Sequence, residues 1–428
     1  MLKGQFPVEK FASLRTPFYY YDLPLLRRTL DKIRECIEPY PQFHVHYAVK
    51  ANFNGRILQE ISRCGFGADC VSGGEIRAAL QNGFAPESIV YAGVGKSDEE
   101  ILLALDAGIA RFNVESAAEL EVINELALSR GVVAPVSLRV NPDIGAHTHA
   151  NITTGLAENK FGINYEQLPG VIELADSLPG VEYKGLHFHI GSQILEMDDF
   201  VALCNRINVL AEQILRQRRG RLVPAASSAA AVGYSSSAAG AAGVSGSGAA
   251  AGVAGAAGAA ASVLGDINVG GGLGINYYHP NHLDVAEFSQ YFETFARHLK
   301  LPEGTPVHFE LGRSVVAPCG SLISRVLYIK EGTTRRFAII DASMTELIRP
   351  ALYKAYHRVE NISSYEPEEV YDVVGPVCES SDVFAKGVSI DKCHRGDFIA
   401  IRSAGAYGES MSSQYNCRPL PACFFKED

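Results

Sequence analysis

The chain has 428 residues, of which 47% are hydrophobic and 20% charged, a balance typical of a globular protein with about two domains. Lys and Arg total 38 against 48 Asp and Glu, and the formal net charge of −10 makes nucleic acid an unexpected partner. Nine cysteines without a C-x-x-C pair favour a reduced, cytoplasmic protein without a metal site. Outside one segment of unusual composition, no charge-free apolar run reaches the roughly 20 residues of a membrane helix, and the first ten residues do not resemble a secretory signal.

Strand-like and helix-like stretches alternate along most of the chain. A strand-like run at Phe18–Tyr21 follows Pro17. Eight further β-rich apolar runs then predict strands at Phe43–Val49, Gly67–Val71, Ser88–Ala92, Ile109–Val114, Val136–Asn141, Gly185–Ile190, Asp266–Val269 and Val307–Leu311. Apolar residues three and four positions apart predict amphipathic helices between them, at Arg56–Cys64, Gly74–Asn82, Asp98–Leu105, Ala117–Ser129 and Asp199–Arg216.

This alternation predicts an α/β fold, and its eight repeats favour a parallel (β/α)8 barrel, which we assign to residues 24–313. A doubly wound open sheet shares the same alternation, so the periodicity alone does not close the barrel. The count of eight strands is the feature that decides for the barrel.

One segment inside this region, residues 225–262, contains only Ala, Gly and Ser apart from three Val and one Tyr. Its small side chains bury too little apolar area to offset the entropy of ordering the backbone, and its glycines disfavour a helix. We interpret it as a flexible insertion between the sixth helix and the seventh strand. A marginal Ala-rich helix pair and an artificial sequence are the alternatives.

The pattern changes after Arg313 to β-rich runs without long helices between them. These runs predict strands at Leu322–Ile329, Phe337–Ala342, Glu369–Val374 and Asp397–Ile401. We therefore expect a second, mainly β domain, a β-sandwich or barrel, formed by residues 314–428 together with residues 1–23.

The carboxyl ends of the barrel strands are where active sites of such barrels form. Lys50 follows the first strand, and burial there would favour the neutral amine that bonds to a carbonyl cofactor. The alternative is a side chain that extends to solvent. Gly270, Gly271 and Gly272 follow the seventh strand, where backbone N–H groups could converge on an anion, although a plain flexible turn has the same sequence.

The sixth and eighth strands end in further polar groups. His189 follows the sixth strand, and Glu310 and Arg313 come at the end of the eighth. A carboxylate here could hold a protonated ring nitrogen and a guanidinium could bind phosphate, whereas the alternative is an ion pair between Glu310 and Arg313. An amine, an imidazole, a glycine-lined anion site and a carboxylate together match the requirements of pyridoxal 5'-phosphate.

Several motifs in order along the chain carry a family resemblance. They are the run from Thr16 to Asp22, Ala-Val-Lys-Ala-Asn around Lys50, His-Ile-Gly-Ser-Gln from His189, Gly-Gly-Gly-Leu-Gly from Gly270 and Glu-Leu-Gly-Arg from Glu310. With them the chain resembles the fold-type III pyridoxal-phosphate decarboxylases, most closely those that act on diaminopimelate. The resemblance covers nearly the whole chain except 225–262. Leu311 stands where the family normally has Pro, which affects the stiffness of the turn and no reactive group.

The resemblance implies roles for individual residues. Lys50 would bind the cofactor covalently, His189 would stack on its ring, and Glu310 would pair with its ring nitrogen. The other cofactor-binding residues would be Ser192, Gly270, Gly271, Gly272, Gly312, Arg313 and Tyr407. The implied reaction is decarboxylation of meso-2,6-diaminopimelate to L-lysine and CO2, the final step of lysine biosynthesis.

Substrate choice would depend on the second domain. The end of meso-diaminopimelate that does not react carries a carboxylate and an ammonium, for which guanidinium and hydroxyl groups and a carboxylate are suitable partners. The implied substrate-binding residues are Arg313, Arg349, Tyr353, Glu379 and Tyr407. Either Cys378 or Lys50 would return the proton to the α-carbon. The resemblance also implies a homodimer, with the loop at Cys378 and Glu379 reaching the neighbouring chain's site.

Three other functions share parts of this pattern. A decarboxylase of carboxynorspermidine, ornithine or arginine would use the same cofactor chemistry, but Arg349, Tyr353 and Glu379 argue against it. A racemase with a similar barrel needs a second proton-transfer residue across the ring. A binding protein that keeps the fold without catalysis would have lost cofactor groups that this sequence retains.

Overall fold

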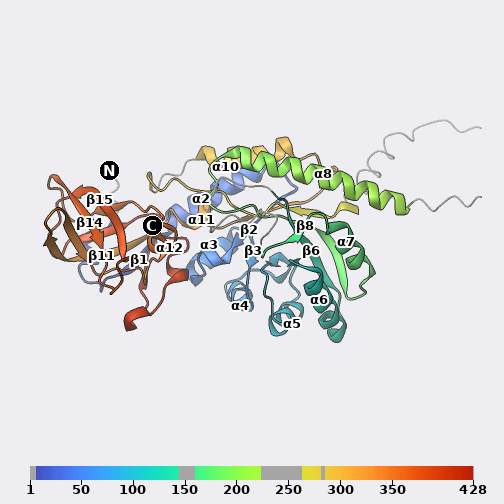
Figure 1. The fold of residues 1–428 in the computed structure, drawn as a ribbon, viewed down its shortest axis with the longest axis horizontal. Coiled ribbons are helices and arrows are strands. Elements are labelled where there is room, and N and C mark those ends of the chain that lie inside the picture. The colour runs from blue at the N-terminus through green and yellow to red at the C-terminus, as the bar shows by residue number, and fades with distance from the viewer. Residues whose placement is uncertain (1–5, 144–159, 223–262, 281–284, 428) are drawn as a thin grey trace, which may run out of the picture.

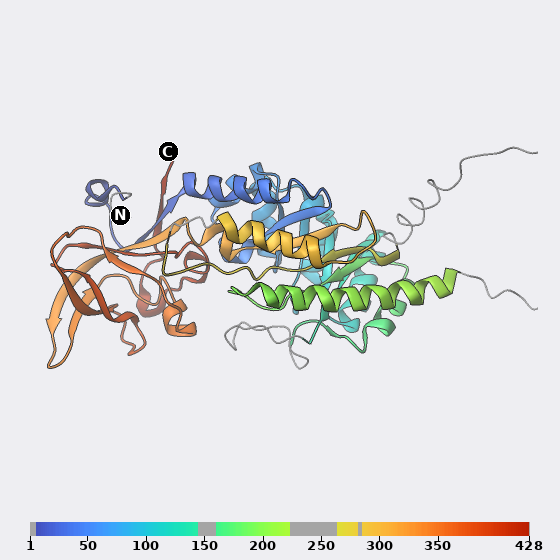
Figure 2. The same cartoon turned by 90° about the horizontal axis from the view of Figure 1, so that it is seen from above.

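The computed structural model describes residues 6–143, 160–222, 263–280 and 285–427, so the segment 225–262 lies outside the described residues. A barrel flanked by helices forms one part of the molecule, and a mainly β domain forms the other (Figure 1). The first and last described segments both lie at the β domain, as the second view confirms (Figure 2).

The barrel contains eight parallel strands. They are β2 (Phe43–Ala48), β3 (Gly67–Cys70), β4 (Ile89–Tyr91), β5 (Arg111–Val114), β6 (Ala134–Asn141), β8 (Val181–His187), β9 (Asp266–Asn268) and β10 (Val307–Leu311). Their order is β5-β4-β3-β2-β10-β9-β8-β6, and β5 also pairs with β6, with Phe112 opposite Val136. The two-residue strand β7 (Ile163–Asn164) adds to β6. The predicted closed barrel is therefore confirmed, and the open sheet is excluded.

Helices surround the barrel strands. They are α2 (Leu23–Ile37), α3 (Gly55–Arg63), α4 (Gly73–Gln81), α5 (Asp98–Ala107), α6 (Ala117–Arg130), α7 (Leu168–Ser177), α8 (Met197–Leu222) and α10 (Val285–His298), with single turns at η2 (Val49–Ala51) and η3 (Pro86–Ser88). Figure 2 shows α8 and α10 running side by side, and α2 packs against α10. Serine begins three successive helices: Ser72, Ser97 and Ser116 each accept a hydrogen bond from the backbone three residues on. Each such cap stabilises its helix by about 1 kcal/mol.

The sixth barrel strand ends earlier than predicted. It was expected at Gly185–Ile190, but β8 spans Val181–His187. The Phe188 N–H still donates to the Asn268 carbonyl at 2.8 Å, after which Gly191 turns the chain with a φ of 152°. His189 consequently lies in the loop beyond the strand, on the face where the polar residues gather.

The second domain is an eight-stranded, mainly antiparallel sheet. Its strands are β1 (Phe18–Asp22), β11 (Gly320–Glu331), β12 (Arg336–Ile340), β13 (Val359–Asn361), β14 (Glu368–Val374), β15 (Val383–Asp391), β16 (Phe398–Ile401) and β17 (Ala422–Lys426). Short helices accompany them at α1 (Val8–Phe11), α11 (Arg313–Val316), α12 (Arg349–Tyr353), η5 (Glu409–Met411) and η6 (Tyr415–Cys417). The predicted β domain is confirmed, and β1 pairs with β11 and β17 as expected of an N-terminal strand in this domain. No helix in the described part of the chain is long and apolar enough to cross a membrane.

Candidate active site

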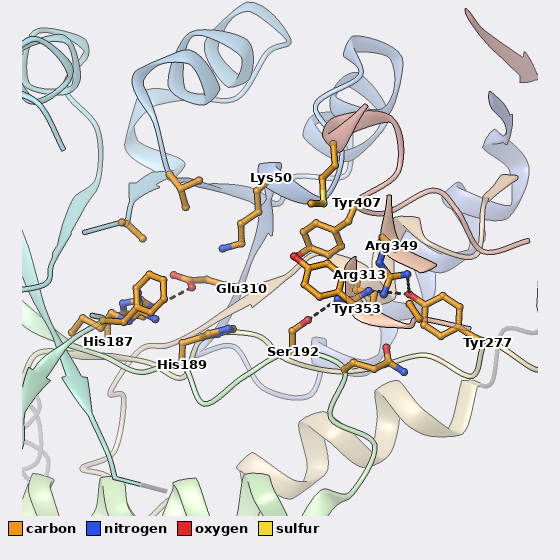
Figure 3. Close-up of a pocket in the computed structure, with 18 of the residues that line it drawn as sticks. Lys50, His187, His189, Ser192, Tyr277, Glu310, Arg313, Arg349, Tyr353 and Tyr407 are labelled. Carbon is orange, nitrogen blue, oxygen red and sulfur yellow. Dashed lines mark hydrogen bonds and ion pairs between the residues drawn. The ribbon is translucent and has the colours of Figure 1, made fainter. Parts of the chain in front are cut away.

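A cavity of 580 Å³ opens at the carboxyl ends of the barrel strands, against the β domain. Eight of the predicted site residues line it: Lys50, His189, Ser192, Glu310, Arg313, Arg349, Tyr353 and Tyr407. Figure 3 shows Lys50 and Glu310 close together at one end and Arg313, Arg349 and Tyr277 together at the other, with His189 and Ser192 on the wall between. The structure therefore brings together groups separated by more than 300 residues in the sequence.

Lys50 lies in the turn η2 directly after β2, and its side chain is 39% exposed because it faces the cavity. Its Nζ lies 3.3 Å from Oδ2 of Asp69, a fully buried carboxylate on β3. Burial alone would lower the pKa of Lys50, but Asp69, Tyr407 and Glu310 raise it above its ordinary value. Burial thus favours the neutral amine as expected, but the carboxylate on the adjacent strand outweighs this effect and stabilises the ammonium.

Glu310 is buried at the end of β10 and does not contact Arg313, so the alternative of an ion pair between them is wrong. Its Oε2 lies 3.1 Å from Nε2 of His187, and its Oε1 accepts from the side-chain amides of Asn113 at 3.2 Å and Asn268 at 2.8 Å. Burial alone would raise the pKa of Glu310, but His187 and Lys50 hold it well below its usual range. Glu310 is therefore an ionised carboxylate that faces the cavity with its position fixed.

The glycine run after β9 is tightly packed. A Cβ on Gly271 would lie 1.9 Å from the carbonyl oxygen of Glu310, so no larger residue fits there. The N–H of Gly270 donates to Asn268 Oδ1 at 2.9 Å, and that of Gly271 to Nδ1 of His189 at 3.3 Å. Two of the three N–H groups of the glycine run therefore bind side chains in this conformation, and the predicted role of the run in holding an anion stays a prediction.

A smaller cavity of 90 Å³ adjoins Lys50 beside the last glycine of the run. Its walls include Ser192, Gly272, Gly312, Arg313 and Tyr407. Gly272 has a φ of 110°, and a Cβ there would lie 2.8 Å from the Gly191 carbonyl oxygen. A hydroxyl, a guanidinium and backbone without side chains thus surround a space next to the reactive amine.

The far end of the main cavity is cationic. Arg313 donates to Ser192 Oγ at 3.0 Å and to the hydroxyl of Tyr277 at 2.9 Å, and its guanidinium lies 4.8 Å from the ring centre of Tyr407. Arg349, at the start of α12, donates to the same Tyr277 hydroxyl at 2.8 Å. Both arginines are buried, and Tyr353 lines the cavity beside them. This end is suited to an anion.

Six predicted site residues do not line the main cavity: Gly272 and Gly312 line the side cavity instead, Gly270 and Gly271 line neither, and Cys378 and Glu379 lie on the surface. Cys378 and Glu379 are exposed, and Glu379 accepts a hydrogen bond from the Tyr415 hydroxyl at 2.7 Å. The Cys378 N–H donates to the Asn416 side chain at 3.3 Å. Within one chain these two residues lie on the surface of the β domain and do not line the cavity that contains Lys50.

Comparisons with known proteins agree with this geometry. The family described as "Pyridoxal-dependent decarboxylase, pyridoxal binding domain" matches residues 26–218. The diaminopimelate decarboxylase of Bacteroides thetaiotaomicron is 54% identical over 427 residues, with 100% of both chains covered. That of Zymomonas mobilis is 37% identical, with 96% of this chain and 87% of the relative covered. The chain belongs to the diaminopimelate decarboxylase family.

A solved structure of this family has the same fold. Diaminopimelate decarboxylase from Helicobacter pylori, complexed with L-lysine, superposes with a TM-score of 0.83 at 35% identity, covering 98% of this chain and 94% of that one. The correspondence thus extends over both the barrel and the β domain.

The residues present fit pyridoxal phosphate, the cofactor of the decarboxylase family. The amine of Lys50 faces the cavity, and the carboxylate of Glu310 is ionised and held by three side chains. The Nε of Arg313 is buried without a partner in the described part of the chain, next to the glycine-lined side cavity. A covalent partner, a counter-charge for a ring nitrogen and an anion site are therefore all in place.

Sequence reasoning missed several residues of this decarboxylase site. They are Asp69, Asn113, Arg139, His187, Asn268, Tyr277 and His357. Most are polar residues within the last few positions of apolar barrel strands, which was a usable signal. His357 gave no such signal, and Tyr277, although it follows the glycine motif by three residues, has no local feature that marks it as a partner of the two arginines.

Proposed function

We propose that this chain decarboxylates meso-2,6-diaminopimelate to L-lysine and CO2 with pyridoxal phosphate, as the last step of lysine biosynthesis. The observation that carries the proposal is one cavity with Lys50 and Glu310 at one end and two buried guanidinium groups at the other. A substrate with an amino-acid group at each end matches that length of cavity: one end reacts while the other binds the arginines. The names of the relatives support the same reaction.

When bound, the cofactor provides the electron sink for loss of the carboxylate. Lys50 would hold the cofactor through its amine, and Asp69 at 3.3 Å would position that amine. Burial and the charge of Glu310 raise the pKa of Asp69 above its ordinary value, while the ammonium of Lys50 lowers it, so the two groups stabilise each other as an ion pair. Glu310 would keep a proton on the ring nitrogen, because the network with His187 stabilises the charged carboxylate.

Other residues would bind the cofactor without reacting. His189 is partly buried and lines the cavity, and its pKa lies well below the ordinary value because of desolvation and the positive charges of Arg139 and Lys50. A neutral imidazole can pack flat against a ring. Ser192, Gly272, Gly312, Arg313 and Tyr407 would hold the phosphate, with Gly270 and Gly271 shaping the loop.

We infer that the active enzyme is a homodimer. Cys378 and Glu379 are exposed in the single chain and lie apart from its cavity, so the placement of Glu379 at the substrate ammonium requires a second copy. Cys378 of the neighbouring chain or Lys50 would then return the proton to the α-carbon.

A mixture of two inactive variants tests the shared site. Lys50→Ala and Glu379→Ala, co-expressed with different tags, should form mixed dimers in which one of the two sites is intact. With random pairing, we expect about a quarter of the wild-type activity to return. If each site uses residues of one chain only, mixed dimers will be no more active than the variants alone.

A substrate panel tests the reaction itself. We expect kcat/KM for meso-diaminopimelate to exceed that for ornithine or arginine by at least about 1,000-fold, because those substrates leave the buried guanidinium groups unpaired. Released CO2 and formation of L-lysine are the two measurements. Faster release of CO2 from ornithine or arginine would establish the related basic amino-acid decarboxylase instead.

We also infer a cytoplasmic location, supported by nine cysteines without a C-x-x-C pair. Cell fractionation with an antibody to the chain would test it. We further propose that residues 24–313 form the barrel domain and that residues 1–23 together with 314–428 form the β domain.

A further inference from the structure

One phenol oxygen joins the two buried arginines of the cavity. Nη1 of Arg313 donates to the Tyr277 hydroxyl at 2.9 Å, and Nη1 of Arg349 donates to it at 2.8 Å (Figure 3). Tyr277 is 8% exposed, and its ring lies 5.2 Å from the Arg349 guanidinium. Two like charges are thus held close to each other by a neutral oxygen.

His357 completes the bonding of Arg349. Its Nε2 lies 2.8 Å from Arg349 Nη1, and its Nδ1 lies 2.9 Å from the Arg402 carbonyl oxygen. The carbonyl can only accept, so Nδ1 carries the proton and Nε2 accepts from the arginine. Burial and the charge of Arg349 lower the pKa of His357 to about 3, consistent with a neutral ring. Both hydrogens of Arg349 Nη1 are therefore used, one by Tyr277 and one by His357.

This bonding leaves one edge of Arg349 without a protein partner. Its Nε is buried and unpartnered in the described part of the chain, and no described residue accepts from its Nη2. A guanidinium can bind a carboxylate with two parallel hydrogen bonds through either Nε–Nη2 or Nη1–Nη2, and with Nη1 occupied the Nε–Nη2 edge is the one left. Tyr277 and His357 occupy the other nitrogen, so the donors of this edge are left for a ligand.

The hydroxyl proton of Tyr277 is also available. The oxygen accepts two hydrogen bonds, which uses both lone pairs, and no described residue accepts its proton. Two guanidinium donors polarise the O–H bond and make it a stronger donor. Neither Arg313 nor Arg349 forms an ion pair with a described carboxylate, and two buried cations without a counter-charge define an anion site.

We propose that Tyr277 is a specificity-determining residue that binds the carboxylate at the unreacting end of the substrate, and that His357 is a positioning residue that fixes Arg349 for the same carboxylate. The proposal rests on the proposed function, since it assigns the anion site to the substrate. Arg313 also contacts Ser192, next to the side cavity, so the other source of an anion is the cofactor phosphate.

Inhibition by two amines that differ only by one carboxylate distinguishes a site for the substrate carboxylate from a site for the cofactor phosphate. L-Lysine carries the carboxylate of the unreacting end, and cadaverine is the same chain without it. We expect the wild-type holoenzyme to be inhibited more strongly by L-lysine than by cadaverine. In Tyr277→Phe, the inhibition constant of L-lysine should rise about 10-fold to 100-fold while that of cadaverine changes less than about twofold, because only a charge-assisted hydrogen bond has been lost.

Matched variants control for structural damage. Tyr278→Phe alters the adjacent tyrosine, which is 62% exposed and stacks on Tyr356, and should leave both inhibition constants unchanged. His357→Leu should weaken L-lysine binding, and His357→Gln should restore part of it, since the amide oxygen can accept from Arg349. A merely structural role would not be rescued in this way.

Three results would overturn the proposal. Equal weakening of L-lysine and cadaverine in Tyr277→Phe would mean that the hydroxyl has no specific partner on the carboxylate. Loss of the bound cofactor's absorbance, with the preference for L-lysine retained, would assign the anion site to the phosphate. A wild-type enzyme that does not prefer L-lysine to cadaverine would instead contradict the proposed function on which the inference rests.

Discussion

Lys50→Ala is expected to lower kcat by more than about 1,000-fold and to abolish the visible absorbance of the bound cofactor. The side chain reaches the cavity from the turn after β2, and no other lysine lines that cavity in the described part of the chain. Loss of the amine removes the only covalent attachment point available there. Absorbance spectra of the purified variant and the release of CO2 are the two measurements.

Lys184→Ala is a suitable control, because that lysine lies on β8, contacts Glu182 and takes no part in the cavity. It should keep both the absorbance and the turnover of the wild type. If Lys50→Ala itself retained the absorbance band and normal turnover, the assignment of the cofactor to this residue would be wrong.

Glu310→Gln is expected to lower kcat by about 100-fold to 1,000-fold while the cofactor stays bound. The neutral amide would not stabilise a proton on the ring nitrogen of the cofactor. The cofactor would then stabilise less well the electron pair that remains when the carboxylate leaves as CO2. The shape of the site should persist, because the substituted side chain can still bind His187 and Asn268. Rate and cofactor content are measured on the same preparation.

Glu303→Gln, a substitution at an exposed residue before β10, provides the comparison and should leave kcat unaltered. A Glu310→Gln enzyme with the kcat of the wild type would remove Glu310 from the chemistry. Loss of cofactor without a change in rate per bound cofactor would give it a binding role only.

Much of the fold followed from local patterns in the sequence. Each barrel strand is a short apolar run bounded by an amphipathic helix, so runs such as Phe43–Ala48 and Val307–Leu311 were recognisable individually. Closure was not local: it depends on β5 pairing with β6, which the periodicity of neither strand reveals. The number of strands predicted the barrel correctly because eight is the count at which such a sheet closes.

The protonation states and partners of individual side chains were harder to predict from the sequence than the fold. Lys50 and Glu310 were found because each ends a strand at the face where barrel active sites form. The direction of the burial effect on Lys50 was predicted, but the larger opposing effect of Asp69 was not, since Asp69 lies on the next strand and only the folded chain brings the two groups to 3.3 Å. His187 was missed for the same reason, because it contributes to the site through its contact with Glu310, which only the folded chain forms.

The partners of side chains at the far end of the cavity were the hardest to predict from the sequence. Arg313 and Arg349 were predicted as anion-binding residues, but their shared partner Tyr277 was not. A tyrosine in a loop has no local feature that distinguishes a bridging role from ordinary packing. Its position between two guanidinium groups is a property of the tertiary structure alone.

Reduction of the holoenzyme with borohydride, followed by peptide mass mapping, tests the central claim most directly. Borohydride fixes the link between the cofactor and the amine that holds it, and proteolysis then locates the modified residue. We expect a single cofactor adduct, on the peptide that contains Lys50. An adduct on another lysine such as Lys96, or a holoenzyme that yields no adduct at all, would contradict it.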